Sequence, residues 1–345
     1  MPDFLKKLCS LRGVSGDEGE VREYIKGEIE GYCDSVTEDA LGNLIVFKKG
    51  CKTPVKKIMV CAHMDEVGVI ITDITEDGFL KFSEVGGMDR RTVMGKRLVI
   101  GEGGVFGVIG NKATHLAKRE ERDKVPKLED MYIDIGAPSR AAAEALVSPG
   151  DTGAFDTQYG EFGSGYIKAR AIDDRAGCAV MLELIKSELP VDCHFAFTVQ
   201  EEVGTRGALV AAAEIAPDIA LIVETTTAAD FPDVRADKKV CVLNGGVVIP
   251  FMDKGTIYDR ELYSLIRGTA EANQIQWQTK TMIAGGNDAS AVQQSGSGAK
   301  AAALAVPVRN LHTPVCVMST SDFEAERELC ALFLGAVGDQ YGYIG

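Results

Sequence analysis

The sequence predicts an α/β protein in which a mixed sheet covered by helices is interrupted by an inserted small all-β domain. After Tyr166, apolar strand-like runs alternate with helical periodicities, as in sheets with helices on their faces. Within residues 68–163, short β-like runs are instead separated by glycines. We therefore expect a larger domain built from residues 1–67 and 164–345, and a β-barrel-like insertion over residues 68–163.

The composition narrows the possible partners. A chain of 345 residues with 46% hydrophobic content can bury a substantial core. Its formal charge of −14 disfavours nucleic acid and anionic membranes as partners. The longest apolar runs, such as residues 299–308, are far shorter than the roughly 20 residues of a membrane span. The N-terminal residues lack an apolar secretory core, so we expect a cytoplasmic protein.

The nine cysteines are scattered and include no Cys-x-x-Cys pair. This pattern favours reduced thiols over a disulfide framework or a structural zinc site with thiolate ligands.

The N-terminal segment is expected to contain two helices followed by three strands. Residues 2–12 have the pattern of a short helix, and Ser15 with Glu18 forms a capping-box pattern for a second helix that reaches about Ile29. Strand-like runs follow over residues 33–37, 44–47 and 57–62.

The insertion is expected to contain five strands and one helix. A charged run over residues 118–124 is interpreted as an exposed loop. The strands are predicted over residues 69–73, 79–82, 97–100, 105–109 and 131–135, and the helix over 140–146.

The C-terminal half is expected to alternate strands with helices. Helices are predicted over residues 174–186, 206–214, 258–273 and 322–337. Strands are predicted over 194–199, 219–224 and 301–308, with two more near Val240 and Thr279.

The strand over residues 194–199 is almost entirely apolar, which indicates burial on both faces, and two carboxylates, Glu201 and Glu202, follow it. Open α/β sheets bind ligands at the carboxyl ends of their strands. Two adjacent, partly buried glutamates repel each other, so they need a cation or raised pKa values. A solvated pair at a strand end is the plain alternative.

Other residues that can bind metals also stand at strand ends and chain breaks. Nitrogen and oxygen ligands of this kind suit zinc, cobalt or manganese. Where one carboxylate bridges two of these metal ions, the ions lie about 3.5 to 4 Å apart. The set comprises His63, Asp65, Asp173, Asp174, Glu201, Glu202, Glu224 and His312.

Over almost its whole length the chain resembles the tetrahedral dodecameric metalloaminopeptidases, which include glutamyl, leucyl, lysyl and deblocking aminopeptidases. The order and spacing of the motifs carry this resemblance. They are Ser15-Gly16 with Glu18 and Val21-Arg22, Asp39 with Gly42-Asn43-Leu44, His63-Met-Asp65-Glu-Val-Gly68, Gly107-Val-Ile-Gly110 with His115-Leu116, Asp173-Asp174-Arg175-Ala-Gly177, Gln200-Glu201-Glu202-Val-Gly204 with Arg206-Gly207, Gly285-Gly286 with Asp288-Ala289, and His312-Thr-Pro314-Val315.

The resemblance implies two divalent metal ions per subunit, with zinc or cobalt expected. His63 and Glu224 would bind one ion, Glu202 and His312 the other, and Asp173 would bridge them.

The resemblance also assigns catalytic roles. Glu201 would be the general base, and Asp65 would fix the tautomer of His63 by accepting its second ring N–H. The peptide bond after Asp173 is expected to be cis. The implied reaction is removal of single residues from the N-termini of short peptides.

The chain departs from the family pattern at three positions. Glu224 stands where an aspartate is usual, Asn287 where threonine is commoner, and Cys316 where an acidic residue is expected. Lys254 and Arg309 are placed by the resemblance near the pocket for the substrate side chain, although either could equally form a structural ion pair.

Two other functions stay open at this stage. Some proteins resembling this family are labelled endoglucanases, and a glycoside hydrolase would need two carboxyl groups and no metal. A catalytically silent oligomeric scaffold is the second alternative. The family resemblance also implies that the insertion mediates dimerisation and that dimers assemble into a homo-oligomeric dodecamer that admits short peptides.

Overall fold

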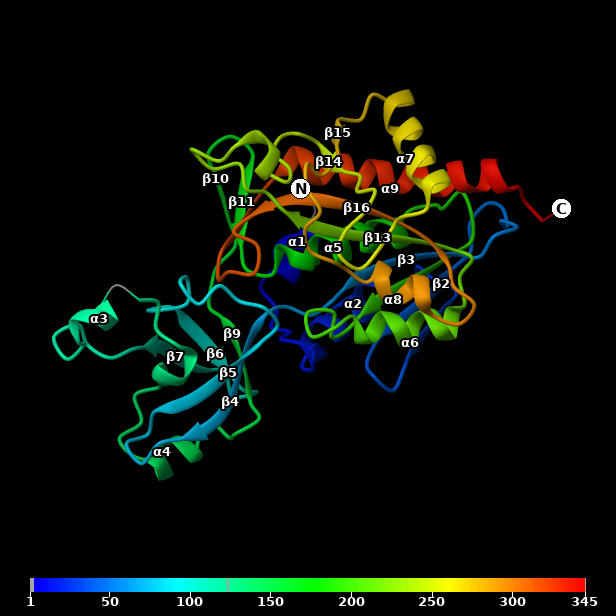
Figure 1. Ribbon diagram of the computed structural model, residues 1–345. Coiled ribbons are helices and arrows are strands. Elements are labelled where there is room, and N and C mark those ends of the chain that lie inside the picture. Colours follow the sequence, from blue (N-terminus) through cyan, green and yellow to red (C-terminus); the bar gives the residue numbers. More distant parts are fainter. Residues whose placement is uncertain (1–2, 123, 345) are drawn as a thin grey trace.

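A large mixed sheet covered by helices and a separate closed barrel make up the computed structural model, which describes residues 3–122 and 124–344 (Figure 1). The barrel is inserted between strands of the large sheet, so the predicted fold class is confirmed. No helix in the described ranges is long and apolar enough to cross a membrane.

The large sheet has eleven strands in the order β1-β2-β12-β3-β13-β16-β17-β11-β10, with β14 and β15 attached beside β16. Its centre is parallel, because β12, β3, β13 and β16 run in the same direction, whereas the outer strands pair antiparallel. The strands are β1 (Ser35–Glu38), β2 (Leu44–Lys48), β3 (Ile58–His63), β10 (Gly160–Phe162), β11 (Tyr166–Ala169), β12 (Cys193–Thr198), β13 (Ile219–Thr227), β14 (Val247–Val248), β15 (Trp277–Gln278), β16 (Lys300–Arg309) and β17 (Cys316–Ser319).

Helices cover both faces of this sheet, which explains why its central strands are apolar throughout. Along β13, Leu221 and Val223 enter one apolar cluster with α5 and α9, while Ala220 and Ile222 enter the opposite cluster with α6 and α8. The helices are α1 (Asp3–Leu8), α2 (Gly19–Ile29), α5 (Ile172–Lys186), α6 (Arg206–Ile215), α7 (Arg260–Ala272), α8 (Ala289–Gln294) and α9 (Thr320–Tyr341), with a 3₁₀ turn, η2, at Ala236–Lys238.

The barrel closes in the order β4-β5-β8-β7-β6-β9 and has an apolar core of its own. Its last strand ends at Phe155, and Gly160–Phe162 already pairs within the large sheet. Its elements are β4 (Gly68–Ile74), β5 (Leu80–Val85), β6 (Arg97–Ile100), β7 (Val105–Gly110), α3 (Arg119–Arg122), η1 (Leu128–Asp130), β8 (Tyr132–Asp134), α4 (Arg140–Glu144) and β9 (Thr152–Phe155).

The capping box predicted for α2 is wrong. The Ser15 hydroxyl instead donates to Asp65 (2.6 Å), and the Glu18 carboxylate accepts from the backbone of Gly16 and Gln200. Both side chains have tertiary partners 50 residues or more away, as Ser15 to Asp65 and Glu18 to Gln200 illustrate. Such partners compete with a local cap and cannot be read from local spacing.

Several predicted elements differ in position. The N-terminal helix ends at Leu8, and Pro2 lies outside the described residues. Part of the charged run 118–124 forms helix α3 rather than a loop, and residue 123 lies outside the described residues. No described strand lies at Val240, where the backbone takes a positive φ; the strand forms later as β14. Helix α8 and strands β9, β10, β11 and β17 were not predicted from the sequence.

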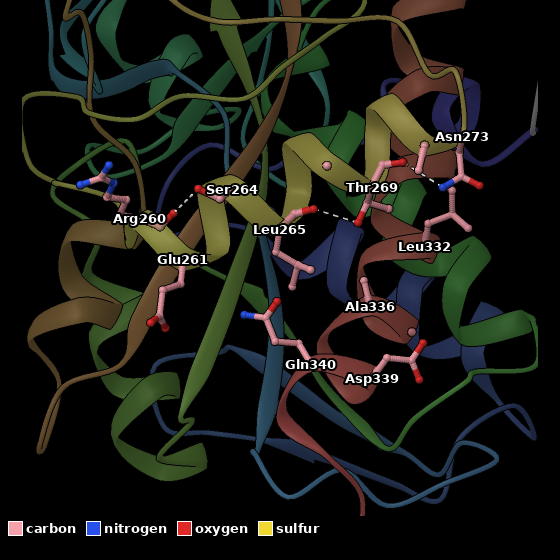
Figure 2. Close-up of a pocket in the computed structure, with 13 residues that line it drawn as sticks. Arg260, Glu261, Ser264, Leu265, Thr269, Asn273, Leu332, Ala336, Asp339 and Gln340 are labelled. Carbon is pink, nitrogen blue, oxygen red and sulfur yellow. Dashed lines mark hydrogen bonds between the residues drawn. The ribbon is translucent and has the colours of Figure 1, made fainter.

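Helices α7 and α9 lie side by side and leave a groove of about 900 Å³ between them (Figure 2). Small residues, among them Gly268, Ala272 and Gly335, let the groove form. It shares no lining residue with the acidic cavity described below.

A buried ionic cluster ties α5 to the N-terminal segment. Arg175 is fully buried, and its guanidinium donates to the carbonyls of Met64 (2.9 Å) and Leu8 (2.6 Å). Glu66 accepts from Arg170 and lies 3.5 Å from Arg175. Each guanidinium group of this cluster has acceptors, so its buried charge is compensated. Removing one of these side chains would leave a polar group of another residue buried without its partner.

We predict that Arg175→Met lowers the free energy of unfolding by about 3 to 5 kcal/mol, since it leaves the buried Met64 carbonyl without its donor and removes one of the two arginines that face the buried Glu66. Arg235, exposed and paired with Asp237, provides the control, for which Arg235→Met should cost less than about 1 kcal/mol. Urea denaturation measures both. Equal midpoints for the two variants would contradict the structural role of the cluster.

Candidate metal centre

The acidic residues predicted from the sequence meet at the carboxyl end of the parallel strands. His63 ends β3, Glu201 and Glu202 follow β12, and Glu224 lies near the end of β13. The neighbouring strands β3, β12 and β13 run parallel, so their ends face the same edge of the sheet.

The Asp173 carboxylate lies between the two histidines. Its Oδ1 is 3.3 Å from His63 Nε2, and its Oδ2 is 3.3 Å from His312 Nε2. His63 is 1% exposed, whereas His312, on the loop between β16 and β17, is 38% exposed. A carboxylate that offers one oxygen to each side has the geometry of a bridging group.

Each histidine has a second carboxylate beside it. Glu202 Oε2 lies 3.4 Å from His312 Nε2, and Glu224 Oε1 lies 3.7 Å from His63 Nε2. Two groups of donor atoms are close enough to hold a metal ion: His63, Asp173 and Glu202, and His63, Asp174 and Glu224.

Asp174 also lies in this region, with its carboxylate engaged by the backbone. It accepts from the N–H of His63 (3.3 Å) and from that of Gly177 (2.9 Å), the latter as an N-capping side chain does. A Cβ at Gly177 would collide with the Val223 carbonyl and with Asp174, so only glycine fits this approach. The Asp173–Asp174 peptide bond is cis, as the resemblance implies.

Asp65 connects β3 to the loop that carries the paired glutamates. Its Oδ1 accepts from the N–H of Glu201 (2.9 Å) and its Oδ2 from the N–H of Glu202 (3.1 Å). Oδ1 also lies 3.3 Å from His63 Nδ1. His63 Nδ1 is also 3.1 Å from the backbone carbonyl of Asp65, so this one buried residue positions a histidine and two glutamates.

The electrostatics of this cluster show a shortage of positive charge. Burial raises the pKa of Glu202 to about 8, an effect that His312 opposes and Asp173 reinforces. Burial also raises the pKa values of Glu201 and Glu224 well above the usual range. Burial alone would lower the pKa of His312, but Asp173 and Glu202 outweigh it and raise this pKa to about 9.

These residues fit divalent cations. Two imidazoles and several carboxylates form a nitrogen and oxygen donor set of the kind that zinc, cobalt and manganese accept. The buried carboxylates need either protons or cations, and a bridging carboxylate between two histidines supplies a place for two ions.

Residues that sequence reasoning did not assign to the site support its loop. Asn43 accepts from the N–H of Val199 (3.0 Å) and donates to the carbonyl of Gly207 (3.0 Å). A Cβ at Gly207 would collide with Asn43 and with the Val199 carbonyl. The motifs around Gly42-Asn43 and Arg206-Gly207 were the available signal, but sequence alone did not connect them.

A cavity of about 140 Å³ adjoins the acidic cluster. Neither Lys254 nor Arg309 lines it; Arg309 instead pairs with Asp230 through two bonds of 2.6 and 2.7 Å. The lining residues are His63, Asp173, Glu201, Glu224, Thr225, Thr226, Thr227, Pro250, Lys280, Ala284, Gly285, Gly286, Asn287, Ala305, Leu311 and His312.

The remaining histidines lie elsewhere. His115 is exposed in the barrel region, and His194 at the start of β12 packs against Phe47 in a tilted arrangement with ring centroids 4.8 Å apart. Of the unusual positions, Asn287 donates to the hydroxyl of Tyr258 (3.1 Å), and the Cys316 thiol is buried beside the carbonyl of Asn310 (3.3 Å).

The sequence of this chain matches a known family and is similar to proteins of that family. The model of the family described as M42 glutamyl aminopeptidase matches residues 42–329. A putative aminopeptidase of Acetivibrio thermocellus is 41% identical over 93% of this chain and 94% of its own length.

Solved structures of similar proteins have the same fold over nearly the whole chain. The TET1 peptidase of Pyrococcus horikoshii, which can assemble into a tetrahedron or a large octahedral shell, superposes with a TM-score of 0.84 at 37% identity, over 96% of this chain and 98% of its own. A Thermotoga maritima protein named an endoglucanase superposes with a TM-score of 0.81 at 34% identity, over 98% of this chain and 99% of its own.

We predict that adding zinc or cobalt to the metal-free chain raises its unfolding free energy, by about 2.7 kcal/mol at a free metal concentration 100 times the dissociation constant. Asp173→Asn should abolish most of this gain, because the bridging charge is lost. The gain is measured by thermal unfolding of protein that has been dialysed against a chelator, with and without added metal. His115→Ala, an exposed histidine, should keep the gain, and an equal loss there would contradict the assignment.

Proposed function

Because the chain belongs to the M42 glutamyl aminopeptidase family, and is therefore a metalloaminopeptidase that hydrolyses peptide bonds, we propose that it removes single residues from the N-termini of short peptides at this acidic centre. The observation that carries the proposal is the Asp173 carboxylate, which offers one oxygen to each of two histidines.

We assign the residues as follows. His63 and Glu224 hold one divalent cation, Glu202 and His312 hold the other, and Asp173 bridges the two. The distances between these side chains support the assignment. When bound, two such cations supply a water of lowered pKa and polarise the scissile carbonyl. Zinc and cobalt are the expected ions.

Glu201 is the proposed general base. Its backbone N–H is fixed by Asp65, and its carboxylate lines the cavity, where it forms no hydrogen bond or ion pair with another described residue. It is therefore free to take a proton from water and to deliver that proton to the departing amine of the shortened peptide.

Asp65 is proposed as the residue that orients this machinery. It holds the amides of Glu201 and Glu202 and faces His63 Nδ1, so it fixes the ring nitrogen that points to Asp173. The carboxylates around the cavity attract the positively charged N-terminus of a peptide, which supports exopeptidase over endopeptidase action.

We predict that Glu201→Gln lowers kcat by roughly 10² to 10⁴-fold while metal content stays near that of the wild type, because the amide cannot accept the proton. Aminoacyl anilides and elemental analysis of the purified protein supply the two readouts. The matched control is Glu214→Gln on the exposed face of α6, with unchanged turnover expected.

A chelator separates this function from glycoside hydrolysis. Peptidase activity should disappear on chelation and return with added metal, whereas a glycosidase would act on a soluble cellulose substrate without metal. Chelator-resistant cellulose hydrolysis by the purified chain would refute the peptidase assignment, and metal-loaded protein without any hydrolytic activity would favour the silent scaffold.

We further propose that residues 68–163 mediate dimerisation and that dimers assemble into a dodecamer. Strand β7 supports this, because it exposes Phe106 (66%) and Val108 (45%) on one face of the barrel. Exposed apolar residues that share a face are typical of an interface.

We predict that Phe106→Glu reduces the native mass of the assembly by placing a charge in the apolar contact. Native mass spectrometry or small-angle scattering would show this. Leu209→Glu, an exposed leucine on α6, controls for added charge alone. A wild-type chain that is monomeric, or a mass that Phe106→Glu leaves unchanged, would contradict the role of this face.

A further inference from the structure

The loop that follows β12 is held by side chains from the N-terminal part of the chain. Each of its first four backbone N–H groups donates to such a side chain. The pairs are Val199 with Asn43 (3.0 Å), Gln200 with Glu18 (3.2 Å), Glu201 with Asp65 (2.9 Å) and Glu202 with Asp65 (3.1 Å). A loop whose amides bind another segment takes its conformation from that segment, because buried N–H groups need their acceptors.

Gln200 has an unfavourable backbone conformation. Its φ of 57° lies in the left-handed region, which residues other than glycine rarely adopt. Such a conformation persists only where the surrounding contacts enforce it. Here the N–H of Gln200 donates to Glu18, and its carbonyl accepts from the N–H of Arg206 (3.2 Å). Because Gln200 directly precedes Glu201, its backbone angles decide in which direction the Glu201 side chain leaves the loop.

The Glu18 carboxylate is buried at this contact. Glu18 is 4% exposed, and its Oε1 accepts from the N–H of Gly16 (2.7 Å) as well as from that of Gln200. Burial raises the pKa of Glu18 to about 7, and Asp65 reinforces this effect while the amide hydrogen bonds oppose it. Although Glu18 stands directly before α2, its side chain makes no capping hydrogen bond to that helix. Burial of this acid therefore serves the contact with the loop and not the helix.

Ser15 supports the other acceptor of the loop. Its hydroxyl donates to Oδ2 of Asp65 (2.6 Å), which is the oxygen that also accepts from the N–H of Glu202. The backbone N–H of Ser15 donates to the carbonyl of Glu66 (3.3 Å). The turn that carries Ser15 and Glu18 is therefore attached both to the residues after β3 and to the loop after β12.

From these contacts we infer that Glu18 is a positioning residue for the reaction: its carboxylate fixes the backbone of Gln200 so that the Glu201 side chain is directed into the cavity. The inference rests on the proposed function, which gives Glu201 the role of general base. A displacement of about 1 Å of a reacting group can cost about 10²-fold in rate, so a residue that touches no substrate can still control turnover.

The competing role for Glu18 is purely structural, namely to stabilise the turn before α2 through the N–H of Gly16. Loss of a purely structural contact would loosen the turn and α2 at least as much as the loop after β12. Loss of a positioning contact would instead loosen the loop selectively, and it would lower kcat while substrate binding stays intact.

The first test is amide hydrogen exchange of the full-length protein without metal, which requires no activity. We expect Glu18→Ala to speed exchange over residues 199–204 by roughly 10-fold or more, because the N–H of Gln200 loses a charged acceptor, while exchange in α2 changes less than about twofold. Glu18→Asp, whose side chain is one methylene shorter, should have the same effect. Glu18→Gln keeps a carbonyl oxygen at the same reach and should retain most of the protection. The matched control is Glu23→Ala, an exposed glutamate of α2 paired with Lys26, which should leave the loop unchanged.

Turnover of aminoacyl anilides is the second readout. Glu18→Ala should lower kcat by roughly 10- to 100-fold with KM and metal content close to those of the wild type, and Glu18→Gln should recover most of kcat. Unchanged exchange over residues 199–204, equal acceleration in the loop and in α2, or an unchanged kcat would overturn the positioning role. If exchange changes as expected but Glu201→Gln keeps full turnover, the general base of the proposed function is wrong although Glu18 holds the loop.

Discussion

Mutual repulsion among buried carboxylates is the constraint on which the rest of this structure depends. Asp173, Glu202 and Glu224 share one buried space with two histidines, and burial pushes the pKa values of both glutamates upward. Such a cluster is stable only if protons or cations compensate it. The surrounding protein therefore has to hold together side chains that repel one another.

The protein meets this demand with rigid connections between distant segments. Asp65 holds the loop that carries Glu201 and Glu202, while Arg175 fastens the start of α5 to the carbonyls of Met64 and Leu8. These contacts join β3, β12 and α5 beside the candidate metal ligands. Because Asp65 and Arg175 hold backbone groups of the surrounding segments, the positions of the candidate ligands can be set before any metal arrives.

Residues of opposite charge line the same cavity. Glu201 and Glu224 reach it from the ends of their strands, and Lys280, which follows β15, lines it as well. The barrel is a separate feature of the fold, since its exposed apolar strand face lies on a unit with its own core.

Local patterns in the sequence determined the fold class, the central buried strands and the identity of the acidic residues, because apolar periodicity and chain breaks report directly on strand ends. The prediction of a capping box at Ser15 and Glu18 failed because both side chains bind partners far along the chain, and local spacing cannot reveal such partners. Only the tertiary structure decided that each histidine lies 3.3 Å from a separate oxygen of Asp173, that Arg309 pairs with Asp230, and that Lys280 lines the cavity. These outcomes depend on how loops from separate strands converge, and that convergence follows from the packing of the whole sheet and its helices.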